Sequence, residues 1–347
     1  MGLNLGIAAD HRFFEHKTGH FHPESPRRLD AVYRMLDREF SGRLVRFTPA
    51  PATMEDIERV HTPGHIEQIL MTANQRTTSL APDTPVSAMT YMAAWLAAGA
   101  CIDGASRLIK KEVDAFFALV RPPGHHALSG RAGGFCVFNN LAIAARYASS
   151  VLGLDRILIV DFDIHHGNGL NDIFYDDQNC YYFSTHDLML YPYSGDIDQA
   201  GSGKGLGYTM NIPIERDFSD DDMVFVYEQT LLPVIRGYRP DLIMVAAGFD
   251  GHADDPIGRN RFSSMLYGRL TRLIVEAAGL FSDARVPLLF CLEGGYEPRA
   301  LAESVGSVIS ALIEDWGEGN KVDAPSPSAV KLVEDVMKIH RQYGVIS

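Results

Sequence analysis

Four apolar runs in this chain each end in a short polar motif, and this pattern constrains the fold more than any other feature. The runs cover residues 114–120, 157–160, 242–247 and 287–292, and each has the length and composition of a buried strand. The motifs that follow them are Arg-Pro-Pro-Gly-His-His at 121–126, Asp-Phe-Asp-Ile-His-His-Gly-Asn-Gly at 161–169, Gly-Phe-Asp at 248–250 and Glu-Gly-Gly-Tyr at 293–296. Because open α/β sheets bind ligands at the carboxyl ends of their strands, we expect these motifs to meet at one edge of one sheet.

Helical patterns alternate with strand-like runs, which is typical of a βαβ-wound protein. The first strand is expected near residues 3–8, and helices over residues 26–40, 87–111, 140–151, 219–237, 262–282, 300–315 and 329–343. With 347 residues and 46% hydrophobic content, the chain can bury one large core. We therefore predict one α/β domain over residues 1–316. A linker and a C-terminal helix, which packs on the domain or on a partner, are expected over residues 317–347.

Charge and cysteine usage narrow the class of protein. The formal net charge of −13 argues against a nucleic-acid surface. It is consistent with cationic substrates such as lysine-rich peptides or polyamines, and equally with a role in solubility alone. No run reaches the ~20 apolar residues of a membrane span. The cysteines lack a Cys-x-x-Cys spacing and suit buried free thiols: Cys101, Cys136, Cys180 and Cys291. We expect a cytoplasmic protein without nucleic-acid or membrane partners, and a homo-oligomer remains open.

Three residues at two strand ends form a candidate metal site. Asp163 and His165 stand two apart, so in an extended segment they project to the same side, and Asp250 can complete the set. Two carboxylates and a neutral imidazole suit Zn²⁺ or Fe²⁺ equally, and three protein ligands leave a position open for water and a carbonyl oxygen. The alternative is that the acidic strand ends merely cap the following helices. The histidine pair opposite these ligands favours the metal site.

His125 and His126 are candidate bases for the proton of a metal-activated water. Each imidazole needs an acceptor that orients it, and Asp161 and Asn168 are the candidates. Tyr296 follows a Gly-Gly pair and is suited to donate a phenolic hydrogen bond to a developing oxyanion. An aromatic residue after Gly-Gly is, however, more often a packing residue.

Two other patterns are not assigned to the site. His16, His20 and His22 lie in one polar loop and could build a metal cluster, but surface loop histidines are usually solvated. The glycine-rich segment 201–207 invites comparison with a phosphate-binding loop. It lacks the preceding strand and the Gly-Lys-Ser/Thr helix start, so a flexible surface loop is the better interpretation.

Together the four motifs resemble the zinc-dependent histone deacetylase family, over about residues 5–312. That family includes bacterial histone deacetylase-like amidohydrolases and acetylpolyamine amidohydrolases. Asn168, where class I members typically carry Asp, and the Glu-Gly-Gly-Tyr motif are more similar to class II. The resemblance implies the arginase-deacetylase α/β fold, with zinc on Asp163, His165 and Asp250.

The resemblance also implies a role for each catalytic residue. His126 would be the general base and then the acid, His125 its electrostatic partner held by Asp161, and Tyr296 the group that polarises the carbonyl. Family members carry structural potassium as well, and the residues that match its inner site are Asp161, Asp163, His165, Ser184 and Thr185.

The substrate tunnel can be assigned in the same way. Gly134 and Phe135 match one wall, and Tyr191 resembles the opposing aromatic residue, with tyrosine where phenylalanine is usual. Asp83 matches the rim aspartate that accepts hydrogen bonds from a peptide backbone. Arg28 would line the pocket on the acetate side.

The expected activity is hydrolysis of the acetyl-lysine amide of proteins or peptides, and acetylpolyamine deacetylation is the alternative. Polyamine-specific relatives narrow the mouth by a long insertion before the position of Asp83 or by an acidic residue near that of Ile257. The short 77–83 stretch and the apolar Ile257 favour a peptide. A silent reader of acylated proteins would lack a site residue, and an arginase-like dimanganese hydrolase would need carboxylates where His125 and His126 stand. Both rank lower.

Overall fold

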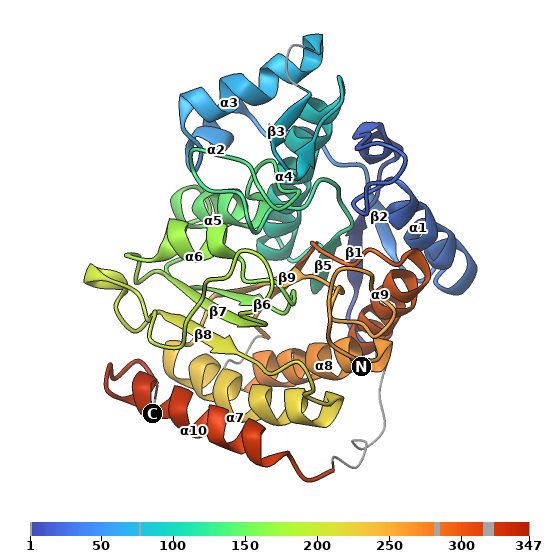
Figure 1. The fold of residues 1–347 in the computed structure, drawn as a ribbon. Helices are drawn as coiled ribbons and strands as arrows, with labels where there is room; N and C mark the ends of the chain where they lie inside the picture. Colours follow the sequence, from blue (N-terminus) through green and yellow to red (C-terminus); the bar gives the residue numbers. More distant parts are fainter. Residues whose placement is uncertain (1, 76–77, 281–284, 315–322, 347) are drawn as a thin grey trace.

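The computed structural model describes residues 2–75, 78–280, 285–314 and 323–346. Its core is one sheet built from β1 (Leu5–Ala8), β2 (Val45–Phe47), β5 (Ala115–Ala118), β6 (Ile157–Asp161), β7 (Cys180–His186), β8 (Thr209–Pro213), β9 (Leu242–Ala247) and β10 (Leu288–Leu292). The spatial order is β2-β1-β5-β10-β9-β6-β7-β8, and every neighbouring pair is parallel (Figure 1). A separate antiparallel hairpin consists of β3 (Ser79–Ala81) and β4 (Thr84–Pro85).

Helices flank the sheet in two groups, as Figure 1 shows. One group consists of α1 (Arg27–Glu39), α7 (Asp220–Tyr238), α8 (Ser264–Leu280), α9 (Pro298–Ile313) and α10 (Pro327–Arg341). The other consists of α2 (Met54–Glu58), α3 (Pro63–Leu70), α4 (Thr90–Ile109), α5 (Asn140–Ser150) and α6 (Asn168–Phe174). Short 3₁₀ turns are η1 (His11–Glu15), η2 (Met71–Asn74) and η3 (Gly203–Gly205). The predicted α/β class with a parallel sheet is confirmed.

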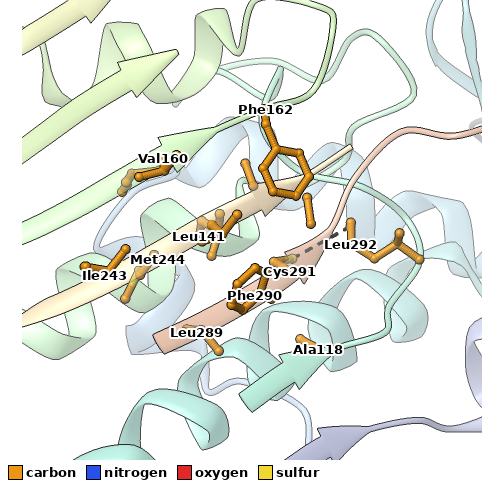
Figure 2. Close-up of a cluster of buried hydrophobic side chains, with 14 of the residues drawn as sticks. Ala118, Leu141, Val160, Phe162, Ile243, Met244, Leu289, Phe290, Cys291 and Leu292 are labelled. Atoms are coloured by element: carbon orange, nitrogen blue, oxygen red, sulfur yellow. Dashed lines mark hydrogen bonds between the residues drawn. The ribbon is translucent and has the colours of Figure 1, made fainter. Parts of the chain in front are cut away.

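The four strands predicted before the polar motifs are adjacent at the centre of the sheet. Every residue of β5, β10, β9 and β6 is buried, because helices cover both faces, and such strands have continuous apolar sequences. Figure 2 shows this packing, with Phe290 of β10, Met244 of β9 and Val160 of β6 drawn near Leu141 of α5. Adjacent parallel strands end at one edge, so the four motifs meet there.

The sequence patterns do not predict β7 or β8. β7 ends in Ser184, Thr185 and His186, which interrupt its apolar character although all three are buried. Their polar atoms are paired inside the protein: Ser184 Oγ lies 2.9 Å from His186 Nδ1, and Thr185 Oγ1 lies 3.1 Å from the Tyr227 hydroxyl. Burial is possible because these partners replace water. The 201–207 segment lies between β7 and β8 and precedes no helix, as its interpretation as a loop requires.

The C-terminal helix α10 packs on the body of the protein. Ser326 caps it by accepting a hydrogen bond from the Ala329 amide, and the Ser326 amide donates to Asp222 Oδ1 on α7 at 2.6 Å. Val333 and Val336 are buried on its inner face. Residues 315–322, with the predicted domain boundary and half of the predicted linker, lie outside the described residues, as do the predicted ends of α8 and α9. None of the described helices combines the length and apolar character needed to cross a bilayer.

A buried ionic network holds the loop before α1 against the ends of the central strands. The carboxylate of Glu24, which is fully buried, accepts hydrogen bonds from Arg121 and from Arg28 Nη1, the latter at 3.2 Å. Arg28 also donates to the backbone carbonyls of Glu293 and Gly295, after β10. Although burial raises it, the charge of Arg121 brings the pKa of Glu24 well below its usual value. The network therefore stays ionised and joins α1 to β5 and β10.

The same network corrects the interpretation of one loop histidine. His16 is not solvated: it is buried, with Nε2 3.3 Å from Glu24 Oε2 and Nδ1 2.8 Å from Thr90 Oγ1. His20 is exposed and His22 is half-buried. Among the described residues, none of these three histidines belongs to a group that could hold a metal.

Replacing Glu24 by alanine should reduce the free energy of unfolding by about 3–5 kcal/mol, because two buried guanidinium groups would lose their shared carboxylate. Asp30→Ala is the control, since its carboxylate pairs with Arg34 at the surface and should contribute less than about 1 kcal/mol. Urea unfolding followed by circular dichroism measures both. Equally small losses would show that the network does not stabilise the fold.

Candidate active site

The polar motifs converge where β5, β10, β9 and β6 end, near the middle of the molecule in Figure 1. The buried side chains at this edge are His125 and His126 after β5, Asp163 and His165 after β6, Asp250 after β9 and Glu293 after β10. The structure thus brings together the predicted metal ligands and the predicted histidine pair.

Asp163, His165 and Asp250 have the geometry of a three-ligand metal site. Their potential ligand atoms all lie within 4.8 Å of one another. His165 Nδ1 is 2.9 Å from Asp250 Oδ2 and 3.2 Å from Asp163 Oδ1. A tetrahedral ion with bonds of ~2.0–2.1 Å separates its ligands by roughly 3.3 Å, so a zinc ion fits this set with small adjustments. Fe²⁺ is equally compatible with the donor types.

Electrostatics also favour a cation at this position. Burial, together with the charge of Asp163, raises the pKa of Asp250 to about 7. Although burial lowers it, the carboxylates of Asp250 and Asp163 raise the pKa of His165 well above its usual value. Two carboxylates this close together in a buried site favour a bound positive charge. A metal ion can provide that charge in place of a proton.

Two glycines let the ligand carboxylates lie against the neighbouring backbone. A Cβ atom on Gly248 would lie 1.9 Å from Asp163 Oδ2, and one on Gly294 would lie 2.2 Å from Asp250 Oδ2. The Gly294 amide donates to Asp163 Oδ2 at 2.9 Å. Gly248 and Gly294 are therefore required by their close approach to the ligand carboxylates.

The two histidines after β5 have different partners, and the predicted pairings are both present. His125 Nδ1 lies 3.2 Å from Asp161 Oδ2, and His126 Nδ1 lies 2.9 Å from Asn168 Oδ1. Although burial opposes it, the carboxylates of Asp163 and Asp161 raise the pKa of His125 to about 10. Burial and the neighbouring charge of His125 bring the pKa of His126 well below its usual value. These shifts favour the charged form of His125 and the neutral form of His126.

Glu293 has a position that sequence reasoning missed. Its Oε2 accepts hydrogen bonds from the amides of Gly124 at 2.6 Å and His125 at 3.1 Å, so it fixes the turn that carries the histidine pair. Burial raises the pKa of Glu293 to about 7. The available signal was an acidic residue placed directly after a fully apolar strand.

A second group that could hold a metal consists of His125, Cys136 and Glu293. Burial raises the pKa of the Cys136 thiol well above its usual value, so the thiol stays protonated and is a poor ligand. One carboxylate oxygen of Glu293, Oε2, already accepts hydrogen bonds from two backbone amides. Asp163, His165 and Asp250 are therefore better suited to hold a metal than this second group is.

Tyr296 lies between Arg28 and Phe135. The Arg28 guanidinium is 4.9 Å from the centre of the Tyr296 ring, and the Phe135 ring is 5.5 Å away. Among the described residues no side chain or backbone group hydrogen-bonds the Tyr296 hydroxyl. Burial raises the pKa of Tyr296 well above its usual value, so the hydroxyl remains protonated and can donate.

Several of the predicted tunnel residues contact His126, Tyr296 or one another. The Tyr191 ring contacts the His126 ring edge-on at 4.9 Å, and Asp83 Oδ2 accepts a hydrogen bond from the Gly134 amide at 3.2 Å. Phe135 follows Gly134 with its backbone in the left-handed region, at φ 67°.

Ile257 is half-buried in a loop that is joined to Tyr296. Asp255 makes this connection, because its carboxylate accepts hydrogen bonds from the amides of both residues, at 2.9 Å for Ile257 and 2.6 Å for Tyr296.

A cavity of about 720 Å³ lies at the opposite edge of the sheet, before the amino ends of the strands. Leu3, Val113, Asp241 and Pro287 contribute to its lining. None of the metal ligands or paired histidines borders it, so this cavity is separate from the candidate active site.

Comparison with known proteins identifies the family. A model of the histone deacetylase domain matches residues 22–312. "Histone deacetylase 15" of Arabidopsis thaliana is 35% identical over 93% of this chain, which spans 58% of that protein. A "Probable deacetylase" of Archaeoglobus fulgidus is 33% identical over 97% of this chain and 98% of its own length. Human "Polyamine deacetylase HDAC10" is 36% identical over 84% of this chain and 45% of that protein.

A solved structure described as the HDA15 HD domain superimposes with a TM-score of 0.91 and 33% identity, covering 98% of this chain and 95% of that one. This likeness confirms the expected arginase-deacetylase fold. The fold, the family model and the relatives agree with the motifs at the strand ends. The chain therefore belongs to the histone deacetylase family, a family of deacetylase-type hydrolases.

Proposed function

We propose that this protein is a zinc-dependent deacetylase that hydrolyses the acetyl-lysine amide of proteins or peptides. The observation that carries the proposal is the buried Asp163, His165 and Asp250 set beside a histidine pair with unequal partners. When bound, the metal would polarise the amide carbonyl and lower the pKa of a water molecule. Fe²⁺ would supply the same chemistry.

His126 moves the proton in this mechanism. Its Nδ1–H donates to Asn168 Oδ1, which leaves Nε2 unprotonated and able to accept a proton from the attacking water. The same nitrogen then donates that proton to the leaving amine. Charged His125, held by Asp161, stabilises the negative charge of the transition state, and the Tyr296 hydroxyl donates to the carbonyl oxygen.

The proposal also includes a structural potassium ion, a cellular location and the bounds of the catalytic domain. Structural potassium would bind Asp161, Asp163, His165, Ser184 and Thr185; in its support, Asp161 and Ser184 are register partners in β6 and β7. Four buried, unpaired cysteines support a cytoplasmic location. We retain residues 1–316 as the catalytic domain, and residues 317–347 as linker and C-terminal helix.

Acetylpolyamines are the second candidate substrate. The net charge of −13 suits a polycation, and human polyamine deacetylase is among the relatives. The apolar Ile257 offers no carboxylate to the distal amines of a polyamine, which supports the peptide. Kinetics on an acetyl-lysine peptide beside acetylspermidine and acetylputrescine separate the two, and a higher kcat/KM on an acetylpolyamine would reverse the order.

Chelation should abolish activity, and Asp250→Ala should remove both activity and stoichiometric metal, because two protein ligands hold zinc too weakly. Asp254→Ala is the control, since Asp254 is exposed four residues away. Metal content by mass spectrometry and turnover on one peptide are measured together. Full turnover by the metal-free protein would eliminate this mechanism.

Tyr296→Phe should lower kcat by roughly 100-fold or more, as expected for the loss of one oxyanion donor. Metal content and the free energy of unfolding should not change, because the ring and its contacts remain. Tyr343→Phe is the control, because Tyr343 lies near the C-terminus and its ring contacts His340 away from the site. Near-normal turnover of Tyr296→Phe would make Tyr296 a packing residue only.

The histidines should separate in a pH–rate profile. His126→Ala should reduce kcat more than His125→Ala, because only His126 carries the proton. Asn168→Asp should move the acidic limb of kcat/KM to higher pH, because a carboxylate raises the pKa of His126 and only its neutral form accepts a proton. If the acidic limb does not move in Asn168→Asp and His125→Ala is the less active of the two alanine variants, then His125 is the base and His126 its partner.

A further inference from the structure

Phe21 is presented to solvent by a firmly anchored loop. Its relative exposure is 102%, which means that the side chain makes almost no contact with the protein. The next residue, His22, lies 3.1 Å through Nδ1 from the Glu24 carbonyl oxygen and 3.2 Å through Nε2 from the Asp83 carbonyl oxygen. The Thr18 hydroxyl also donates to the Glu24 carbonyl. These hydrogen bonds hold the loop in the conformation that exposes Phe21.

The loop that carries Phe21 contacts the residues assigned to the tunnel wall through His22. The ring of His22 packs edge-on against the Phe135 ring at 4.8 Å, and Phe135 contacts Tyr296. The Asp83 backbone bonds His22, while its carboxylate bonds the Gly134 amide of the tunnel wall. Phe21 is therefore one residue away from the wall formed by Phe135.

A second exposed aromatic side chain lies on the loop that carries the opposite wall. Tyr191 contacts His126 and is 39% exposed, and Tyr193, two residues later, is 73% exposed. Met189, on the same loop, is 75% exposed. Single exposed apolar residues are ordinary, but here they occur on both loops that border one site.

We propose that Phe21, together with the exposed Tyr193 on the Tyr191 loop, forms an apolar subsite for a large apolar side chain next to the acetylated lysine of a protein substrate. The inference rests on the proposed function and names its substrate class. Its basis is the continuity of Phe21 with the tunnel wall through His22, Phe135 and Asp83. A polyamine carries no apolar side chain and gains nothing from this surface. An extended peptide places its flanking side chains on the rim.

The test compares substrates that differ only beside the acetyl-lysine. One peptide has Phe on both sides of the acetyl-lysine, a second has Gly at both positions, and a third substrate is acetyl-lysine amide without neighbours. Wild type should prefer the Phe-flanked peptide by about 10-fold in kcat/KM. That factor corresponds to about 1.4 kcal/mol, or roughly 50–60 Å² of apolar surface removed from water.

Phe21→Ser should reduce this preference to about 3-fold or less and leave hydrolysis of acetyl-lysine amide unchanged. Leu206→Ser is the matched control, because Leu206 is 47% exposed and precedes Gly207, which lies against Tyr343 near the C-terminus. It should retain the wild-type preference.

Several results would overturn the subsite. They are an equal preference in wild type and Phe21→Ser, no preference in wild type, or an equal loss by Phe21→Ser on all three substrates. Sedimentation of the same proteins tests whether a second copy of this chain binds the surface. A wild-type dimer that dissociates in Phe21→Ser would assign the surface to self-association instead. A wild type inert on every acetyl-lysine substrate would contradict the proposed function itself.

Discussion

Two buried carboxylates at short range are the interaction on which the site depends. Asp163 and Asp250 leave neighbouring regions of the sheet edge and both approach His165 Nδ1, away from water. Their mutual repulsion would be costly without donors and a cation. The Gly294 amide supplies one donor, and the missing side chains of Gly248 and Gly294 provide the room. The sequence around the site is therefore constrained by the need to hold the Asp163 and Asp250 carboxylates close together.

The two histidines after β5 have unequal surroundings. The rings of His125 and His126 are only 4.0 Å apart, so both cannot readily be charged. Asp161 faces His125 and the neutral Asn168 faces His126, which directs the positive charge to His125. In the proposed mechanism one histidine provides charge and its neighbour exchanges a proton. Glu293 holds the turn on which this division depends.

The sequence predicted the elements whose chemistry is local. A buried strand followed by a polar motif can be recognised within about ten residues, so the convergence of Asp163, His165 and Asp250 could be inferred before their contacts were known. Features that depend on distant partners could not. His16 was misjudged because its burial depends on Glu24 and Thr90, and β7 was missed because its polar end is paired within the core. The exposure of Phe21 likewise depends on how its loop is anchored.

The metal position is the central claim, and anomalous diffraction at the zinc edge tests it most directly. Crystals of the zinc-reconstituted protein should give one strong anomalous peak in the site, between Asp163, His165 and Asp250. A peak between His125, Cys136 and Glu293, or none at this edge of the sheet, would contradict the assignment and the mechanism built on it.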